Sequence, residues 1–153
     1  MAQQPIAFVA YSSANSELAS GILDAVRRAN ARPAAVRYEP WEYNDIPGHS
    51  LISPILERIE ESAFVVADIT YLNLNVVYEI GFCIGSGRRA FLVRHKNLHG
   101  DREIARQSGI FDSLGYFEYA DFESLSQRLT DHIDPSPPVF STEIDYKAPV
   151  YVV

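Results

Sequence analysis

The chain has 153 residues, 47% of them hydrophobic and 22% charged, a balance typical of one globular domain and not of a disordered or fibrous protein. Its net charge of −7 argues against direct nucleic-acid binding, and its single cysteine excludes an intramolecular disulfide and a cysteine-cluster metal site. No apolar stretch is long enough to span a bilayer, and the N-terminus lacks the positive charge that begins a signal peptide. We therefore expect a cytoplasmic protein without membrane contact.

Short apolar runs alternate with segments of helical periodicity. The apolar runs predict strands at residues 6–11, 33–38, 63–68, 90–94 and 115–119. Apolar side chains that recur every three or four residues predict helices over residues 15–30, 50–61, 75–85 and 122–133. Such alternation is typical of an α/β fold whose helices cover both faces of a parallel sheet. We expect a flavodoxin-like three-layer sandwich with a central parallel sheet of about five strands in the order 2-1-3-4-5.

The end of the chain differs from the rest. Residues 134–138 read D-P-S-P-P, which predicts a linker after a domain that spans residues 1–133. Residues 148–153 read A-P-V-Y-V-V and predict a strand. This strand-like tail is either the start of a further domain or a strand added to the edge of the sheet.

Ligands of open parallel sheets bind beyond the carboxyl ends of the strands, where the winding direction reverses. In the expected order this point lies between the first and third strands. Tyr11, Ser12 and Ser13 follow the first of these strands. Each serine either binds a ribose or phosphate or caps the following helix.

The segment after the third strand carries the candidate chemistry. It holds Asp68, Asn73, Asn75 and Glu79 between a buried strand and the start of a helix. If Asn75 is the N-cap, Glu79 lies in or just beyond the first turn, where the helix dipole favours an ionised carboxylate. A carboxylate in this crevice stabilises or attacks an oxocarbenium ion, as cleavage of a glycosidic bond requires. The alternative is structural, with Asn75 only a cap and Glu79 only a residue matched to the dipole.

Other patterns indicate structural roles. His95 and His99 lie in a basic loop without a nearby paired carboxylate, so we expect no metal site there. Gly81, Gly85 and Gly87 lie inside and after a helix, which does not match a dinucleotide-binding motif. Close helix–sheet packing and a helix C-cap explain these glycines better.

Residues 68–81 resemble a known family. The letters D-I-T at residues 68–70 and N-L-N-V-V-Y-E-I-G at residues 73–81 resemble the D-x-T/S…N-x-N-V-x-Y-E-x-G signature of TIR-like and nucleoside 2-deoxyribosyltransferase-like domains. Residues 8–13, F-V-A-Y-S-S, are similar to the first-strand opening of TIR domains. The resemblance covers about residues 6 to 94. It implies a flavodoxin-like domain that cleaves N-glycosidic bonds of nucleosides or NAD⁺, with Glu79 as the single essential glutamate.

The resemblance also implies a biological setting and further contacts. Bacterial members act as antiviral defence effectors when a partner domain or chain is triggered. Deoxyribosyltransferases carry further acids that bind the sugar and base, and Asp45 is the loop acid that we nominate for this role. Trp41, in the loop of residues 39–49, either closes over the base or packs against the core. This loop is a candidate lid or assembly surface.

The chemistry of the leaving group favours NAD⁺ as the substrate. Nicotinamide leaves NAD⁺ without a general acid, whereas a neutral base is helped by protonation from a second titratable group. Asp68 is the candidate for that second group, with a structural hydrogen bond as its alternative role. In this interpretation Ser12, Asn73 and Asn75 orient the ribose or phosphate, and Tyr78 shapes the entrance.

Two alternatives stay open. The first is a nucleoside 2-deoxyribosyltransferase or nucleotide N-glycosidase that forms a glycosyl-enzyme intermediate on Glu79. The second is a non-catalytic domain that binds a nucleotide or assembles. We expect no cofactor besides the nucleotide substrate, and either a homo-oligomer or a partner sensor domain or chain. The sequence leaves the choice between NAD⁺ and NADP⁺ open.

Overall fold

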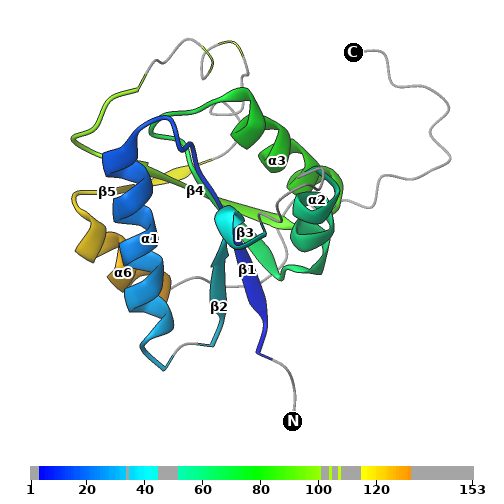
Figure 1. Cartoon of the computed structure of the whole chain (residues 1–153), viewed down its shortest axis with the longest axis horizontal. Helices are drawn as coiled ribbons and strands as arrows, with labels where there is room; N and C mark the ends of the chain where they lie inside the picture. Colours follow the sequence, from blue (N-terminus) through cyan, green and yellow to red (C-terminus); the bar gives the residue numbers. More distant parts are fainter. Residues whose placement is uncertain are drawn as a thin grey trace, which may run out of the picture.

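The computed structural model describes residues 4–33, 35–44, 52–100, 104, 107 and 115–131. Its sheet consists of five parallel strands in the order β2-β1-β3-β4-β5 (Figure 1). The strands are β1 (Ile6–Ala10), β2 (Arg37–Pro40), β3 (Phe64–Asp68), β4 (Arg89–His95) and β5 (Tyr116–Tyr119). The helices are α1 (Ser16–Asn30), α2 (Ile52–Glu61), α3 (Leu74–Gly85) and α6 (Phe122–Asp131), with a 3₁₀ helix η1 (Trp41–Asn44) after β2. The predicted α/β flavodoxin-like arrangement and its strand order are confirmed.

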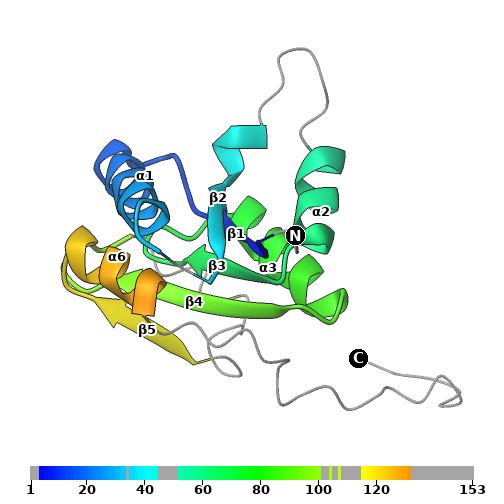
Figure 2. The same ribbon diagram turned by 90° about the horizontal axis from the view of Figure 1, so that it is seen from below.

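Helices α1 and α6 cover one face of the sheet, and α2 and α3 cover the other (Figure 2). Successive side chains of a strand point to opposite faces, so each strand serves both layers. Ala7 and Val9 of β1 belong to the core beneath α1 and α6, whereas Phe8 and Ala10 belong to the core beneath α2 and α3. All five residues of β3 are buried, as expected for a central strand covered on both faces.

Strand β2 begins later than the sequence predicts. The apolar run suggested residues 33–38, but the observed strand is Arg37–Pro40. Glu39 is buried within it because Arg58 of α2 donates a hydrogen bond from Nε to its carboxylate at 2.7 Å. Arg58 and Glu39 are 19 positions apart, so their ion pair cannot be read from local hydropathy. The predicted strand therefore ended before Glu39, whereas the observed strand includes it. The same pair fastens α2 to the edge of the sheet.

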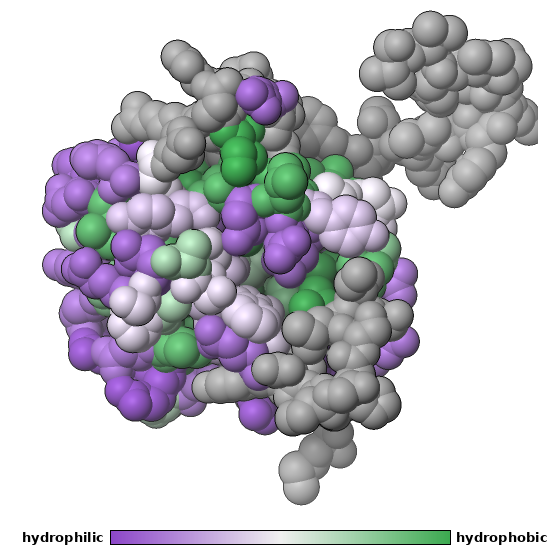
Figure 3. Space-filling model, turned by 45° about the horizontal axis from the view of Figure 1, so that its top comes forward, coloured by the Kyte–Doolittle hydropathy of each residue, from purple (hydrophilic) through white to green (hydrophobic). Residues whose placement is uncertain are grey.

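The glycines of α3 have two different roles. Gly87 has a φ of +70° directly after the C-cap Ser86, so the predicted glycine at the end of this helix is confirmed. The prediction of close helix–sheet packing at Gly81 and Gly85 is wrong, because a Cβ added at either position meets nothing within 4 Å. Both glycines are exposed. The face of the molecule drawn in Figure 3 carries hydrophobic side chains among polar ones.

Asp68 forms a buried network that joins the ends of three strands. One carboxylate oxygen accepts a hydrogen bond from the backbone N–H of Thr70 at 2.8 Å, and the other accepts from the hydroxyl of Tyr119 at 2.7 Å. The Thr70 hydroxyl in turn accepts from the backbone N–H of His95 at 2.8 Å. Burial raises the pKa of Asp68 to about 6, although these hydrogen bonds act in the opposite direction. The network therefore assigns Asp68 a structural role in the sheet.

Some sequence predictions lie beyond this description. The predicted linker and strand-like tail, residues 134–153, are outside the described residues, so the domain boundary at residue 133 stays a prediction. Within the residues that the structure describes, no helix is long and apolar enough to cross a membrane.

The Asp68 network leads to a prediction about stability. Tyr119→Phe removes one hydrogen-bond donor from the buried Asp68 carboxylate. We expect the free energy of unfolding to fall by about 1–3 kcal/mol near neutral pH, measured by urea denaturation. Tyr116→Phe is the matched control, because Tyr116 belongs to the same strand and is 42% exposed. A similar small loss of up to about 0.5 kcal/mol in both variants would show that the network contributes little.

Candidate active site

A pocket of about 240 Å³ lies at the carboxyl end of the sheet, beside the first strand and the start of α3. Its position matches the predicted reversal point between β1 and β3. Its walls include the predicted site residues Tyr11, Ser13, Trp41, Asn73, Asn75, Tyr78 and Glu79. The predicted residues Ser12 and Asp68 do not line it, and Asp45 lies outside the described residues.

The first turn of α3 is fixed by Asn73. Its side-chain oxygen accepts a hydrogen bond from the backbone N–H of Val76 at 2.9 Å, which makes Asn73 the N-cap. Its amide nitrogen donates to the Ser12 hydroxyl at 3.1 Å and so joins the loop after β1 to the helix. Of the two asparagines that the sequence offers as caps, Asn73 and not Asn75 therefore caps α3. Because α3 begins at Leu74, Glu79 is in the second turn, where the helix dipole acts weakly.

Glu79 has a buried carboxyl group that no other described residue compensates. Only 8% of the residue is exposed, although it lines the pocket. Burial raises its pKa to about 7, and no ion pair or hydrogen bond with another described residue acts against this shift. Desolvation of the Glu79 carboxyl group therefore outweighs the helix dipole, which favours its ionised form. A buried, poorly compensated acid in a cleft is typical of a functional site.

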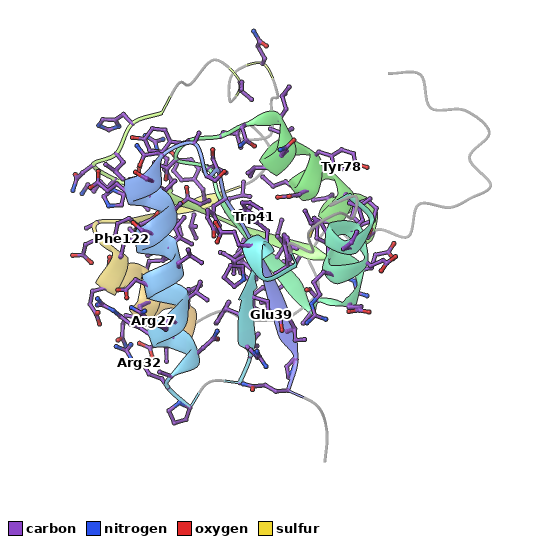
Figure 4. The ribbon with its side chains drawn as sticks, in the orientation of Figure 1. Arg27, Arg32, Glu39, Trp41, Tyr78 and Phe122 are labelled. Atoms are coloured by element: carbon purple, nitrogen blue, oxygen red, sulfur yellow. The ribbon has the colours of Figure 1, made fainter. Side chains whose placement is uncertain are left out.

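Aromatic side chains form a second part of the pocket. Tyr11 and Trp41 have ring centroids 6.2 Å apart, and the Tyr11 hydroxyl donates a hydrogen bond to the Glu42 carboxylate of η1. Trp41 comes from η1, and Tyr78 comes from α3 (Figure 4). The Trp41 ring also packs against both hydrophobic cores, so its pocket and core roles coexist. Its buried Nε1–H has no hydrogen-bond partner in the described part of the chain.

The two serines have different positions. Ser12 is 1% exposed, and its hydroxyl accepts hydrogen bonds from Asn73 and from the backbone N–H of Ala14. Ser13 is exposed and lines the pocket. Neither caps α1, because the side chain of Asn15 accepts the hydrogen bond from the Leu18 N–H at 2.9 Å. Ser12 therefore fixes the loop, and Ser13 is available to a ligand.

Sequence analysis missed the apolar wall of the pocket. Ile55 and Leu56 of α2 line it together with Val76 of α3. Apolar periodicity indicates buried positions in a helix, but it does not distinguish a pocket wall from a core. Among the described residues, no group of three or more His, Cys, Asp or Glu side chains is arranged to hold a metal ion.

Comparison with known proteins finds solved structures with a similar fold. No family model and no curated protein sequence matches the chain. The Clostridium botulinum CMP N-glycosidase BcmB has a similar structure, with 14% identity and a TM-score of 0.55 over 81% of this chain and 97% of that one. A conserved protein from Enterococcus faecalis V583 is 13% identical, with a TM-score of 0.53 over 83% of this chain and 98% of that one. At these identities the likeness shows a shared fold alone.

The burial of Glu79 predicts how stability depends on pH. Its pKa is about 7 in the folded protein, against an ordinary value of 4.5, so folding opposes ionisation. Between these pH values, rising pH lowers the free energy of unfolding through this group, by roughly 3 kcal/mol in total. Glu79→Gln stays neutral, so we expect it to gain stability relative to the wild type between about pH 4 and pH 8 in urea denaturation.

The matched control is Glu60→Gln, at an exposed position of α2. This change removes a carboxylate that is not buried, so its effect should be nearly the same at both pH values. If Glu79→Gln behaves like Glu60→Gln, the Glu79 carboxylate is compensated in solution and the interpretation of the pocket is wrong.

Proposed function

We propose that the protein cleaves the N-glycosidic bond of a nucleoside or nucleotide, with Glu79 as the catalytic carboxylate. The observation that carries this proposal is the carboxyl group of Glu79, a residue that is only 8% exposed, unpaired among the described residues and part of the pocket wall. When a base leaves a sugar, positive charge develops on the anomeric carbon and ring oxygen. A carboxylate in a partly desolvated pocket stabilises that charge more strongly than one in water.

The other lining residues suit the remaining parts of such a substrate. In the proposed complex a base or nicotinamide stacks against Trp41 and Tyr11, with the Trp41 Nε1–H donating to a carbonyl oxygen. Ser13 and Asn75 face the pocket and bind the ribose or phosphate. Asn73 is already engaged in capping α3 and holding Ser12, so its proposed role is to position this wall. Tyr78 narrows the entrance.

NAD⁺ is the first substrate that we propose. Its nicotinamide is cationic before cleavage and leaves as a neutral ring, so no general acid is needed. This suits a pocket whose described lining has Glu79 as its one carboxyl group. Water adds to the anomeric carbon as the bond to nicotinamide breaks, which gives ADP-ribose, nicotinamide and a proton. The cationic ring also favours the ionised form of Glu79 when it binds.

A nucleotide N-glycosidase or deoxyribosyltransferase is the second candidate. It is supported by the pKa of about 7, which leaves part of the Glu79 population protonated near neutral pH. It is also supported by the likeness in fold to a protein named as a CMP N-glycosidase. In this reaction Glu79 attacks the sugar, and water or an acceptor base then releases it. Antiviral defence, a cytoplasmic location, a sensor partner and a contact from Asp45 are further proposals from the family resemblance.

Product analysis distinguishes these reactions. The purified protein is incubated separately with NAD⁺, NADP⁺, CMP, cytidine, and a deoxynucleoside plus an acceptor base, and the products are separated by chromatography. Nicotinamide release is the expected result. Release of cytosine from CMP, or exchange of the base, would favour the second candidate. Saturable binding by calorimetry without any product would identify a non-catalytic nucleotide-binding domain instead.

Substitution of Glu79 tests the role of its carboxylate in whichever reaction is found. We expect Glu79→Gln to keep the fold, because the side chain has nearly the same shape, and to lower turnover by about 10³-fold or more. Glu60→Gln, on the exposed side of α2, should keep the wild-type rate. Turnover by Glu79→Gln at a rate close to that of the control would remove Glu79 from the mechanism.

A further inference from the structure

A second cavity, of about 480 Å³, lies at the opposite end of the sheet from the candidate active site. Its walls include residues before β1, at the end of α1 and at the start of β2, so it is close to the amino ends of these strands. The candidate active site is at their carboxyl ends. In Figure 4, Arg27 and Arg32 of this cavity lie at the lower end of α1, away from Trp41 and Tyr78 of the candidate active site. A cavity of this size is typical of a small-molecule site.

The walls of this second cavity are positively charged. Arg27, Arg32 and Arg37 line it, and no Asp or Glu among the described residues does so. The chain as a whole has a net charge of −7, so its long-range field repels anions. Three arginines around one cavity therefore reverse the sign of the charge locally, and an anion is the ligand that this reversal favours.

Nearby carboxylates neutralise only part of this charge. Asp24 pairs with both Arg27 and Arg28 of α1. Glu123 of α6 pairs with both Arg28 and Arg32. Two carboxylates are thus shared among three arginines. Arg27 and Arg28 lie in the last turn of α1, where the helix dipole favours a cation, but Arg32 lies beyond the helix and the dipole does not account for it.

Arg37 is further from a compensating charge. Its side chain is 61% exposed, and its ion pair with Glu39 joins Nε to the carboxylate at 3.8 Å. Arg58 of α2 already holds that carboxylate, with its own Nε at 2.7 Å. The helix dipole does not explain Arg37, because this residue begins a strand. Its guanidinium is therefore a cation with which an anion in the cavity can pair.

Asn30 holds the backbone between these arginines in place. Its side chain accepts a hydrogen bond from the backbone N–H of Tyr38 at 2.9 Å and donates one to the Tyr38 carbonyl at 2.8 Å. These two bonds join the end of α1, which carries Arg27, to β2, which carries Arg37. The positions from which these arginines extend are therefore fixed before a ligand binds, and this lowers the entropic cost of binding.

We propose that this second cavity binds a small molecule through its phosphate group, with Arg27, Arg32 and Arg37 as the binding residues. A guanidinium presents parallel N–H donors that match two oxygens of a phosphate. The volume of the cavity leaves room for the organic part of a phosphate ester. This molecule lies at the other end of the sheet from Glu79 and takes no part in the cleavage proposed above, so it is a second ligand and not the substrate.

The first experiment locates the site with inorganic pyrophosphate, a compact probe with two phosphate groups. Pyrophosphate is titrated into nitrogen-15-labelled wild-type protein, and the backbone amide signals are followed by NMR. We expect saturable shifts that are largest at Arg32, Val36 and Arg37. Shifts that are largest at Ser13 and Asn75 would place the anion in the candidate active site, and the absence of any saturable shift would mean that neither cavity binds it. Either result would overturn the proposal.

The second experiment measures the dissociation constant of pyrophosphate by calorimetry. Arg27→Gln and Arg37→Gln each remove one guanidinium, so each should raise this constant by about ten-fold or more. Arg128→Gln is the matched control, because Arg128 is an exposed arginine of α6 outside the cavity, and it should keep a constant close to the wild-type value. Arg32 is left in place, since its loss would also break the contact with Glu123 of α6.

Equal weakening by all three substitutions would show that pyrophosphate responds only to the overall charge of the chain. Unchanged binding by Arg27→Gln and Arg37→Gln would show that it binds elsewhere, and each of these results contradicts the proposal. Thermal unfolding followed by circular dichroism verifies that each variant folds, and the NMR titration needs no variant. Neither experiment involves cleavage of a nucleoside, so failure of this site and failure of the proposed function are distinguishable.

Discussion

The Glu79 carboxyl group is buried in the pocket wall without a compensating charge or hydrogen bond from the described residues, and burial raises its pKa to about 7. Several features of the fold hold it there. Asn73 fixes the start of α3 and joins it to the loop after β1. The side chains of Val76 and Ile80, on the inner face of α3, pack into the hydrophobic core. Burial of this carboxyl group therefore opposes its ionisation and lowers stability at neutral and higher pH. A destabilising group that the fold holds rigidly is typical of a site that acts on a ligand.

Asp68 and Glu79 are both buried acids, and their different surroundings give them different roles. Asp68 and Glu79 both have raised pKa values because both are buried. Asp68 accepts hydrogen bonds from Thr70 and Tyr119, and its oxygens are engaged in joining strand ends. Glu79 lines a pocket and has no such donor among the described residues. Charge developing on a ligand can therefore be stabilised by Glu79, whereas Asp68 stabilises the sheet that positions it.

Apolar periodicity was sufficient to predict the helices, the strands and the layers, because it reports burial directly. The pocket residues were predicted from their place at the strand ends and from the family resemblance. Predictions failed where a distant contact decides the local structure. Asn73 and Asn75 are equally good caps by composition, and the structure joins Asn73 to Ser12, 61 positions away. Strand β2 includes Glu39 because Arg58 compensates its charge. The sequence also located Glu79 near a helix start but not its desolvation, which depends on side chains from several elements.

The most direct test of this account is the pKa of Glu79 itself. Carbon-13 NMR of protein labelled at the glutamate carboxyl carbons follows each carboxyl through a pH titration, and the signal missing from Glu79→Gln identifies the one of interest. The account predicts a midpoint near pH 7 for Glu79 in the free protein. A midpoint at or below the ordinary value of about 4.5 would show that the carboxylate is hydrated or paired in solution. The proposed catalytic role would then lose its physical basis.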